Sequence, residues 1–127
     1  MEEAKRRAAE EAVMLVEDGM VVGLGTGSTA AYFIEALGRR VKEGLRVKGV
    51  PTSYQAYLKA LDSGVPVVNL DEVEVIDLAV DGADEVDLAL NLLKGMGAAL
   101  AREKVVDSMA RQLVIVVDES KVVRRLG

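Results

Sequence analysis

The stretch MVVGLGTGST, residues 20–29, decides the fold. Its first half, Met20 to Leu24, is a short continuous apolar run, which is typical of a parallel strand buried on both faces. Its second half, Gly25 to Thr29, is a glycine-rich turn, and apolar residues in helical phase follow from Thr29 to Glu43. A buried strand, a glycine turn and a helix in succession predict helix-on-sheet packing, as in α/β proteins.

The same alternation extends along the chain in both directions. Further helices are predicted over residues 2–18, 53–63 and 98–110, and further strands over residues 46–50, 66–70, 76–80 and 112–117. Ser53 is the expected N-cap of its helix. The pattern predicts a doubly wound, Rossmann-like, mostly parallel sheet with helices on both faces, in a single domain over residues 1–127. Ligands of this fold class bind beyond the carboxyl ends of the strands.

Composition limits the chemistry that the chain can perform. The 127 residues include no Cys and no His, which excludes disulfides and thiolate metal sites and leaves acid–base work to carboxylates, Lys or Tyr. A reducing cytoplasm is therefore the expected location. The formal net charge of −5 favours neither nucleic acid nor an anionic membrane as a partner. The sequence has no signal-peptide pattern and no apolar run long enough to span a membrane.

The glycine loop is the first candidate binding site. Its glycines let the backbone approach an anion, and Thr26, Ser28 and Thr29 supply hydroxyl groups at the start of a helix. The alternative is a tight turn capped by Ser or Thr, but the crowding of hydroxyls favours phosphate. The loop lacks the dinucleotide fingerprint, because Ser28 stands where that motif requires Gly, and it lacks the Gly-Lys of a Walker A loop. A small phosphorylated molecule is therefore the preferred ligand.

The acidic turn Asp81-Gly82-Ala83-Asp84 follows the strand predicted at residues 76–80. Two carboxylates in a cleft can divide acid and base work between them. A solvated turn or a helix cap is an equally good interpretation of the spacing. Two aspartates without further oxygen ligands are weak evidence for a metal, so no metal site is expected.

Three further charged residues have both a functional and an ordinary interpretation. Lys94 stands before Gly95, Met96 and Gly97, where it could stabilise an oxyanion or simply face solvent. Glu103 lies on the helix that follows, where a lone Glu is usually exposed or ion-paired. Lys121 follows the last predicted strand, and its ordinary interpretation is a basic residue in a terminal tail.

Five segments in this order resemble the type A ribose-5-phosphate isomerases, over nearly the whole chain: GLGTGST, VPTSYQA, VDGADEVD, NLLKGMGAAL and VIVVDESK. The resemblance implies interconversion of ribose 5-phosphate and ribulose 5-phosphate without a metal or an organic cofactor. It also implies contacts with the sugar phosphate at three loops and two lysines, namely Thr26, Gly27, Ser28 and Thr29, then Asp81, Gly82, Ala83 and Asp84, then Lys94, Gly95, Met96 and Gly97, and finally Lys121 and Lys5.

The resemblance also implies how the reaction is divided among these residues. Glu103 would move the proton between C2 and C1 through an enediolate, and Lys94 would stabilise the developing oxyanion. Asp81 and Asp84 would hold sugar hydroxyls, with Asp81 a candidate to shuttle a proton between oxygens or to assist ring opening.

The chain departs from the family at two points. Met96 stands where the family usually has glycine, and the family continues into a smaller α/β domain that returns a strand to the main sheet and adds oligomer contacts. The expectation is therefore a truncated, designed or reconstructed single-domain form that exposes apolar surface and associates as a homodimer. Three functions stay open: an isomerase, a non-catalytic module that binds sugar phosphates, and a stable fold fragment without activity.

Overall fold

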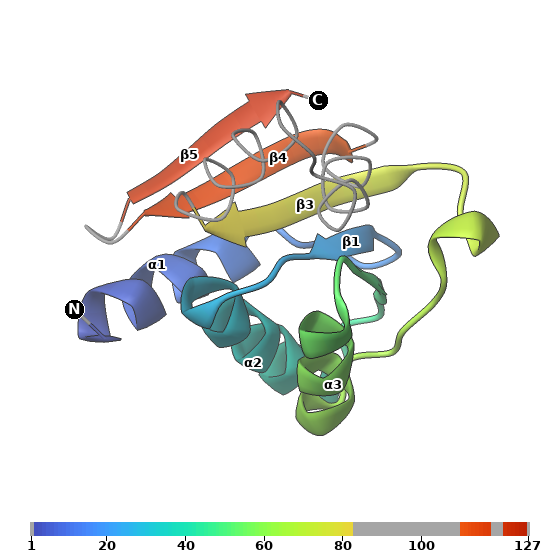
Figure 1. The fold of residues 1–127 in the computed structure, drawn as a ribbon, viewed down its shortest axis with the longest axis horizontal. Coiled ribbons are helices and arrows are strands. Elements are labelled where there is room, and N and C mark those ends of the chain that lie inside the picture. The colour runs from blue at the N-terminus through green and yellow to red at the C-terminus, as the bar shows by residue number, and fades with distance from the viewer. Residues whose placement is uncertain (1, 83–109, 118–120, 127) are drawn as a thin grey trace.

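The computed structural model describes residues 2–82, 110–117 and 121–126 (Figure 1). These residues form three α-helices, one short 3₁₀ helix and five strands in the following order: α1 (Glu2–Val13), β1 (Val21–Leu24), α2 (Ser28–Lys42), β2 (Lys48–Pro51), α3 (Tyr54–Ser63), η1 (Leu70–Glu72), β3 (Ile76–Gly82), β4 (Ala110–Val117) and β5 (Lys121–Leu126).

The strands form one sheet in the order β2-β1-β3-β4-β5. Strands β1 to β4 are parallel, and only β5 runs antiparallel, against β4. Strand β1 lies between β2 and β3, so Leu24 is in register with Pro51 on one side and with Val80 on the other. The prediction of a mostly parallel α/β sheet is confirmed, and the chain reverses its direction across the sheet at β1, where ligands of such sheets bind.

The three α-helices cover one side of the sheet (Figure 1). Helix α2 contacts both α1 and α3, and its Phe33 and Leu37 are fully buried. Helix α1 contributes mostly small side chains to this core, such as Ala8 and Ala12, together with Val13. These helices pack against the strand residues Val22, Leu24, Leu78 and Val80. The largest core of the described residues thus lies between the helices and the sheet.

A second, smaller core lies around Val50, Ile76, Ala79 and Ala110. Its covering side chains come from the segment between α3 and β3: Val68, Leu70 and Val73. This segment has one short turn of helix and otherwise irregular backbone. The helix predicted over residues 98–110 lies outside the described residues except for its last residue, Ala110, which instead begins β4 opposite Ile76.

The predicted strand over residues 66–70 is wrong. Only Val67 makes a β-bridge, with Gly49 at the edge of the sheet, and Leu70 begins η1. Pro66 cannot donate a hydrogen bond to a neighbouring strand, and Asn69 forms a capping box with Glu72 that starts a helical turn. The apolar residues of this segment therefore cover the second core instead of extending the sheet.

Other elements also differ from the prediction in their bounds. Helix α1 ends at Val13 rather than at residue 18, because the next residues turn through tighter bonds, such as that from the Met14 N–H to the Glu11 carbonyl. Residues 121–126, for which no strand is predicted, form β5, so the ordinary interpretation of Lys121 as part of a terminal tail is wrong. The N-cap at Ser53 is confirmed, because its side chain accepts a hydrogen bond from the Ala56 N–H.

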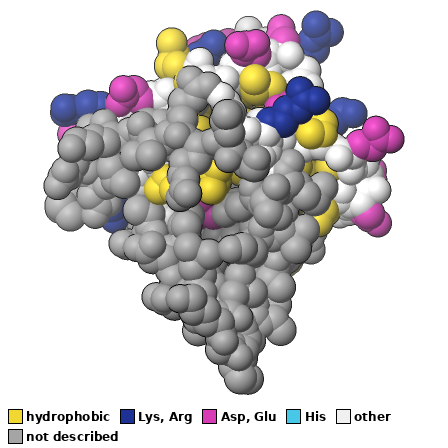
Figure 2. Space-filling view, turned by 90° about the horizontal axis from the view of Figure 1, so that it is seen from above, with side chains coloured by type: hydrophobic (Ala, Val, Ile, Leu, Met, Phe, Trp, Pro, Cys, Tyr) yellow, Lys and Arg dark blue, Asp and Glu magenta, His cyan; other side chains and the backbone are white. Residues whose placement is uncertain are grey.

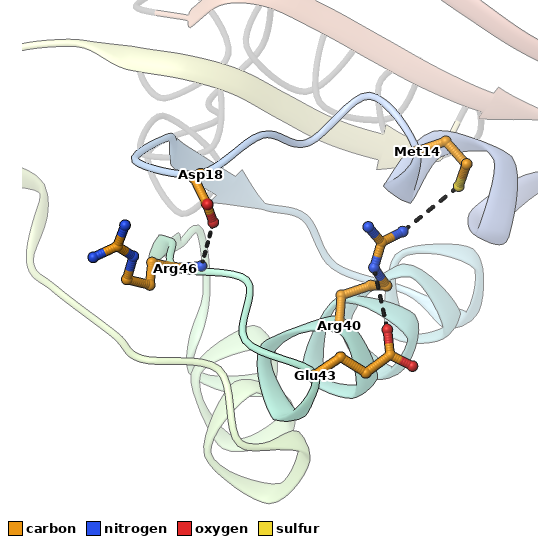
Figure 3. Close-up of polar contacts among 5 residues, drawn as sticks. All are labelled: Met14, Asp18, Arg40, Glu43 and Arg46. Carbon is orange, nitrogen blue, oxygen red and sulfur yellow. Dashed lines mark hydrogen bonds and ion pairs between the residues drawn. The ribbon is translucent and has the colours of Figure 1, made fainter.

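Polar contacts join the loops at the amino end of the sheet (Figure 3). Asp18 accepts a hydrogen bond of 2.9 Å from the Arg46 N–H, and the Gly19 N–H donates to the Arg46 carbonyl at 2.7 Å. Arg40 joins α2 to the end of α1 through the sulfur of Met14 and also contacts Glu43. These contacts hold the entrances to β1 and β2 together at the edge opposite the glycine loop.

No helix within the described ranges combines the length and the apolar character needed to cross a lipid bilayer. On the described part of the face seen in Figure 2, Lys and Arg side chains are interspersed with Asp and Glu, so charge of one sign does not gather there.

Candidate functional site

Gly25 brings the loop after β1 against the end of β3. Its N–H donates to the Val80 carbonyl at 3.1 Å. A side-chain carbon at this position would lie 2.5 Å from both the Val80 carbonyl oxygen and Asp81 Oδ1, which is closer than real carbon atoms come. A glycine is therefore required here, and it places the loop directly beside the Asp81 carboxylate.

Asp81 is a strand residue and is only 1 % exposed. Burial of a carboxylate costs free energy, so such a position is uncommon for an aspartate with no special role. The interpretation of Asp81 as part of a solvated turn is therefore wrong. Gly82, also buried, ends the same strand.

The amino terminus of α2 faces the same edge of the sheet. Its N-cap residue is Gly27, which has a positive φ of 96° and makes no side-chain cap. The alternative of a turn capped by Ser or Thr is therefore contradicted at this helix. Since the first N–H groups of an α-helix lack partners within the helix, an uncapped start of this kind suits an anion.

Lys5 adds a positive charge at this helix start. It lies on α1, and its Nζ donates a hydrogen bond of 3.1 Å to Ser28 Oγ. Ser28 is exposed, whereas Thr29 is half-buried in the first turn of α2. The lysine that the family resemblance assigns to the phosphate thus contacts the glycine loop, across 23 positions of sequence.

A group of hydroxyls holds the other side of the loop. Thr26 Oγ1 lies 2.7 Å from Ser53 Oγ and 3.4 Å from Thr52 Oγ1. Thr52 is buried and donates from its hydroxyl to the Leu24 carbonyl at 2.9 Å. The sequence reasoning assigns no role at the site to Thr52 or Ser53. The available signal is their position directly after β2, the strand that neighbours β1.

A cavity of about 300 Å³ lies beside the loop, between α2 and α3. Its wall combines loop backbone with apolar and polar side chains, two of them charged: Gly25, Thr26, Gly27, Ala31, Ile34, Gln55, Ala56, Leu58, Lys59 and Asp62. Neither Asp81 nor Ser28 belongs to this wall. Of the predicted loop residues, Thr26 and Gly27 line this cavity, whereas the groups suited to a phosphate at Ser28 and to a sugar hydroxyl at Asp81 do not.

The predicted site residues divide into those that the structure describes and those that it does not. The structure brings Lys5, the loop of residues 26–29 and Asp81 to one edge of the sheet, with Gly82 next to them. Lys121 begins β5 and pairs with Val117. The other predicted positions lie outside the described residues: Ala83, Asp84, Lys94, Gly95, Met96, Gly97 and Glu103. Within the described ranges, no three acidic side chains come together in a way that could hold a metal ion.

The chain is similar in sequence to known proteins. The family model for ribose 5-phosphate isomerase A (phosphoriboisomerase A) matches residues 48–127. The ribose-5-phosphate isomerase A of Thermococcus kodakarensis is 58 % identical over 129 residues, which cover 100 % of this chain and 56 % of the relative. The corresponding protein of Methanothermobacter thermautotrophicus is 61 % identical, over 97 % of this chain and 54 % of its own length.

The fold of the chain is also similar to solved structures of ribose-5-phosphate isomerases. The ribose 5-phosphate isomerase A of Methanocaldococcus jannaschii superposes with a TM-score of 0.76 at 49 % identity, over 90 % of this chain and 51 % of its own. A D-ribose-5-phosphate isomerase in complex with phospho-erythronic acid has a TM-score of 0.76 at 52 % identity, with the same coverage. The chain thus spans about half the length of the relatives that it matches.

Proposed function

We propose, because the chain belongs to the ribose-5-phosphate isomerase A family, that it interconverts D-ribose 5-phosphate and D-ribulose 5-phosphate through an enediolate. The observation that carries the proposal is the meeting of three groups at one edge of the sheet: the uncapped start of α2, the ammonium group of Lys5 and the buried carboxylate of Asp81. Residues 1–127 act in this proposal as one domain.

The phosphate of the substrate binds at the start of α2. The N–H groups of residues 28 and 29, the Ser28 hydroxyl and Lys5 supply donors and positive charge for its oxygens. A related isomerase of 52 % identity has been solved with phospho-erythronic acid, a phosphorylated sugar acid, which supports an anion of this class.

The sugar then extends toward the end of β3. Asp81, beside Gly25, holds a hydroxyl of the open-chain sugar and is placed to pass a proton between neighbouring oxygens. Asp84 holds a second hydroxyl, and Gly82 and Ala83, which separate the two aspartates in the sequence, contact the sugar.

Proton transfer between carbons is assigned to Glu103. Its carboxylate removes the C2 proton of the aldose, which leaves an enediolate, and returns that proton to C1 to give the ketose. Lys94, which precedes Gly95, Met96 and Gly97 in the sequence, stabilises the developing negative charge on oxygen, and Lys121 contacts the substrate. This chemistry needs neither a metal nor an organic cofactor.

The test is formation of ribulose 5-phosphate from ribose 5-phosphate in the presence of EDTA, with the Glu103→Gln variant as the matched control. We expect turnover by the unaltered chain and a loss of at least about a hundredfold in the variant, because the amide cannot accept the proton. Equal turnover in both would contradict the assignment of Glu103. Binding of ribose 5-phosphate without turnover would replace the isomerase by a sugar-phosphate-binding module.

The proposal also includes a homodimer and a cytoplasmic location. Helix α3 exposes four large apolar side chains at helical spacing, Tyr54, Tyr57, Leu58 and Leu61, which offer a surface to a second copy of the chain. Sedimentation equilibrium would show a dimer at micromolar concentration, and a monomer at all concentrations would contradict this part. The absence of Cys fits a reducing compartment.

A further inference from the structure

The two residues that follow β2, Thr52 and Ser53, contact the glycine loop through their hydroxyls. We propose that they are positioning residues, which fix the loop so that the N–H groups at the start of α2 point at the phosphate. The identity of the anion rests on the proposed function, whereas the effect on the loop does not.

Thr52 fixes the point at which the loop leaves β1. Its backbone N–H and its hydroxyl both donate to the Leu24 carbonyl, at 3.0 Å and 2.9 Å. The Thr52 hydroxyl has a single proton, which it donates to the Leu24 carbonyl. In its contact with Thr26, the Thr52 oxygen can therefore act only as the acceptor. Because Thr52 is only 6 % exposed, water does not readily replace these contacts.

Ser53 connects the loop to α3. Its Oγ accepts a hydrogen bond of 3.1 Å from the Ala56 N–H as the N-cap of α3, and the same oxygen lies 2.7 Å from Thr26 Oγ1. The position of Ser53 is thus fixed by the helix that it caps. Thr26 is consequently held against a rigid element rather than against another loop.

These contacts persist when a ligand binds, in contrast to the contact on the other side of the loop. Lys5 donates to Ser28 in the structure, and a phosphate would compete with the Ser28 oxygen for the lysine. Thr52 and Ser53 carry no charge, and among the described residues their hydroxyls bond to Thr26 and to the main chain. They therefore define the geometry of the loop before the anion arrives.

Positioning of this kind affects affinity through entropy. A loop with Gly25 and Gly27 has a wide choice of backbone conformations, and each residue that is ordered only on binding lowers the affinity for the ligand. The Gly25 N–H fixes the loop to β3, but the next fixed point before α2 is the Thr26 hydroxyl. Removal of that point leaves the residues that contact the phosphate free to move.

The test compares three variants with the unaltered chain. Thr52→Val and Ser53→Gly each remove one hydroxyl, and glycine is tolerated at an N-cap, while Thr52→Ser keeps the hydroxyl as the conservative control. The first measurement is amide hydrogen exchange at residues 25–29 without ligand. The second is the Kd for inorganic phosphate, and the third is the division of any change between KM and kcat.

We expect exchange at residues 25–29 to accelerate about tenfold in Thr52→Val and Ser53→Gly, with α1 amides unchanged. The Kd for phosphate and the KM should rise about five- to tenfold at unchanged kcat, and Thr52→Ser should behave like the unaltered chain. Unchanged exchange in folded variants would overturn the proposal, as would a fall in kcat alone.

A fourth variant keeps the proposal testable if changes after β2 prevent folding. Thr26→Val removes the hydroxyl contacts with Thr52 and Ser53 from the loop side and leaves β2, the bond from Thr52 to Leu24 and the cap of α3 intact, so it should also show faster exchange. If the unaltered chain has no isomerase activity while exchange responds as expected, the proposed function fails and the positioning role stands. If activity is present and exchange does not respond, only the positioning role fails.

Discussion

At the amino end of β1, aspartates accept hydrogen bonds from the main chain, whereas at its carboxyl end an aspartate lies buried against a glycine. Asp18 accepts from the Arg46 N–H at 2.9 Å, and Asp77 accepts from the Val21 N–H at 2.8 Å. At the other end Gly25 lies against Asp81, and α2 starts at Gly27 without a side-chain cap. The amino end thus holds its loops through aspartates, whereas the carboxyl end holds its loop through hydroxyls and keeps the N–H donors at the start of α2 available.

This difference separates stability from function along a single strand. A carboxylate that accepts a hydrogen bond from a backbone N–H contributes mainly to the free energy of unfolding. A helix start with free donors contributes little to folding and much to anion binding. Matched substitutions at the two ends should therefore affect different measurements, with the largest effect expected at Asp81 and the smallest at Asp18.

Asp81→Asn should have the largest effect on activity. The amide keeps the size of the carboxylate but cannot exchange a proton with a sugar oxygen, so we expect kcat to fall about a hundredfold. The matched variant at the other end is Asp77→Ala, which leaves the Val21 N–H without its partner and should lower the free energy of unfolding by about 1–2 kcal/mol. Turnover per folded molecule should not change in Asp77→Ala, and a large loss there would contradict the comparison. Isomerase assays and urea denaturation measure the two effects.

Gly25→Ala should weaken phosphate binding by about tenfold, because the added carbon would displace the loop from Asp81. The same overpacking should lower the free energy of unfolding by about 1–3 kcal/mol. Gly19→Ala is the control at the other end: its positive φ of 88° makes alanine cost about 1 kcal/mol, but no atom lies within 4 Å of the added carbon. Its Kd for phosphate should equal that of the unaltered chain. If Gly25→Ala also binds phosphate normally, the close approach is not needed for the site.

The sequence predicts those parts of the fold whose pattern is local. Strand β1 and helix α2 follow from an apolar run, a glycine turn and a helical period, and the N-cap at Ser53 follows from its position before a helix. Strand β5 is not predictable in this way, because its residues become a strand only by pairing with β4. Val67 and Leu70 resemble a strand in sequence, because an apolar run that covers a sheet has the same composition as one within it.

The candidate site also has residues that the sequence predicts and residues that it does not. The glycine loop and Asp81 are identifiable from their place at strand ends, and Lys5 from the family resemblance, and the described residues bring them together. The role of Thr52 is not predictable from residue order alone. Its hydroxyl reaches Leu24 because β2 and β1 are neighbours, and strand order is a property of the folded sheet.

Lys5→Met tests the positive charge near the carboxyl end of strand β1. Loss of one cation beside the α2 start should raise the Kd for phosphate about three- to tenfold, and the remaining affinity should depend less on salt. Lys48→Met is the matched control, since Lys48 is an exposed lysine at the first residue of β2, at the amino end of the sheet. Its phosphate affinity should stay within about twofold. Phosphate titrations at two ionic strengths make the comparison, and equal losses in both variants would mean that only net charge matters.

Asp18→Ala should have the smallest effect of all. The Arg46 N–H loses its carboxylate partner, but Asp18 is exposed, so water can take its place. The backbone bond of 2.7 Å from the Gly19 N–H to the Arg46 carbonyl still holds the same two loops. We therefore expect a change of about 0.5 kcal/mol or less in the free energy of unfolding and no change in turnover or phosphate affinity. A much larger loss of stability in urea denaturation would mean that the exposed carboxylate, rather than the backbone bond, holds the amino end of β1, and a loss of turnover would mean that the two ends of the strand do not act separately.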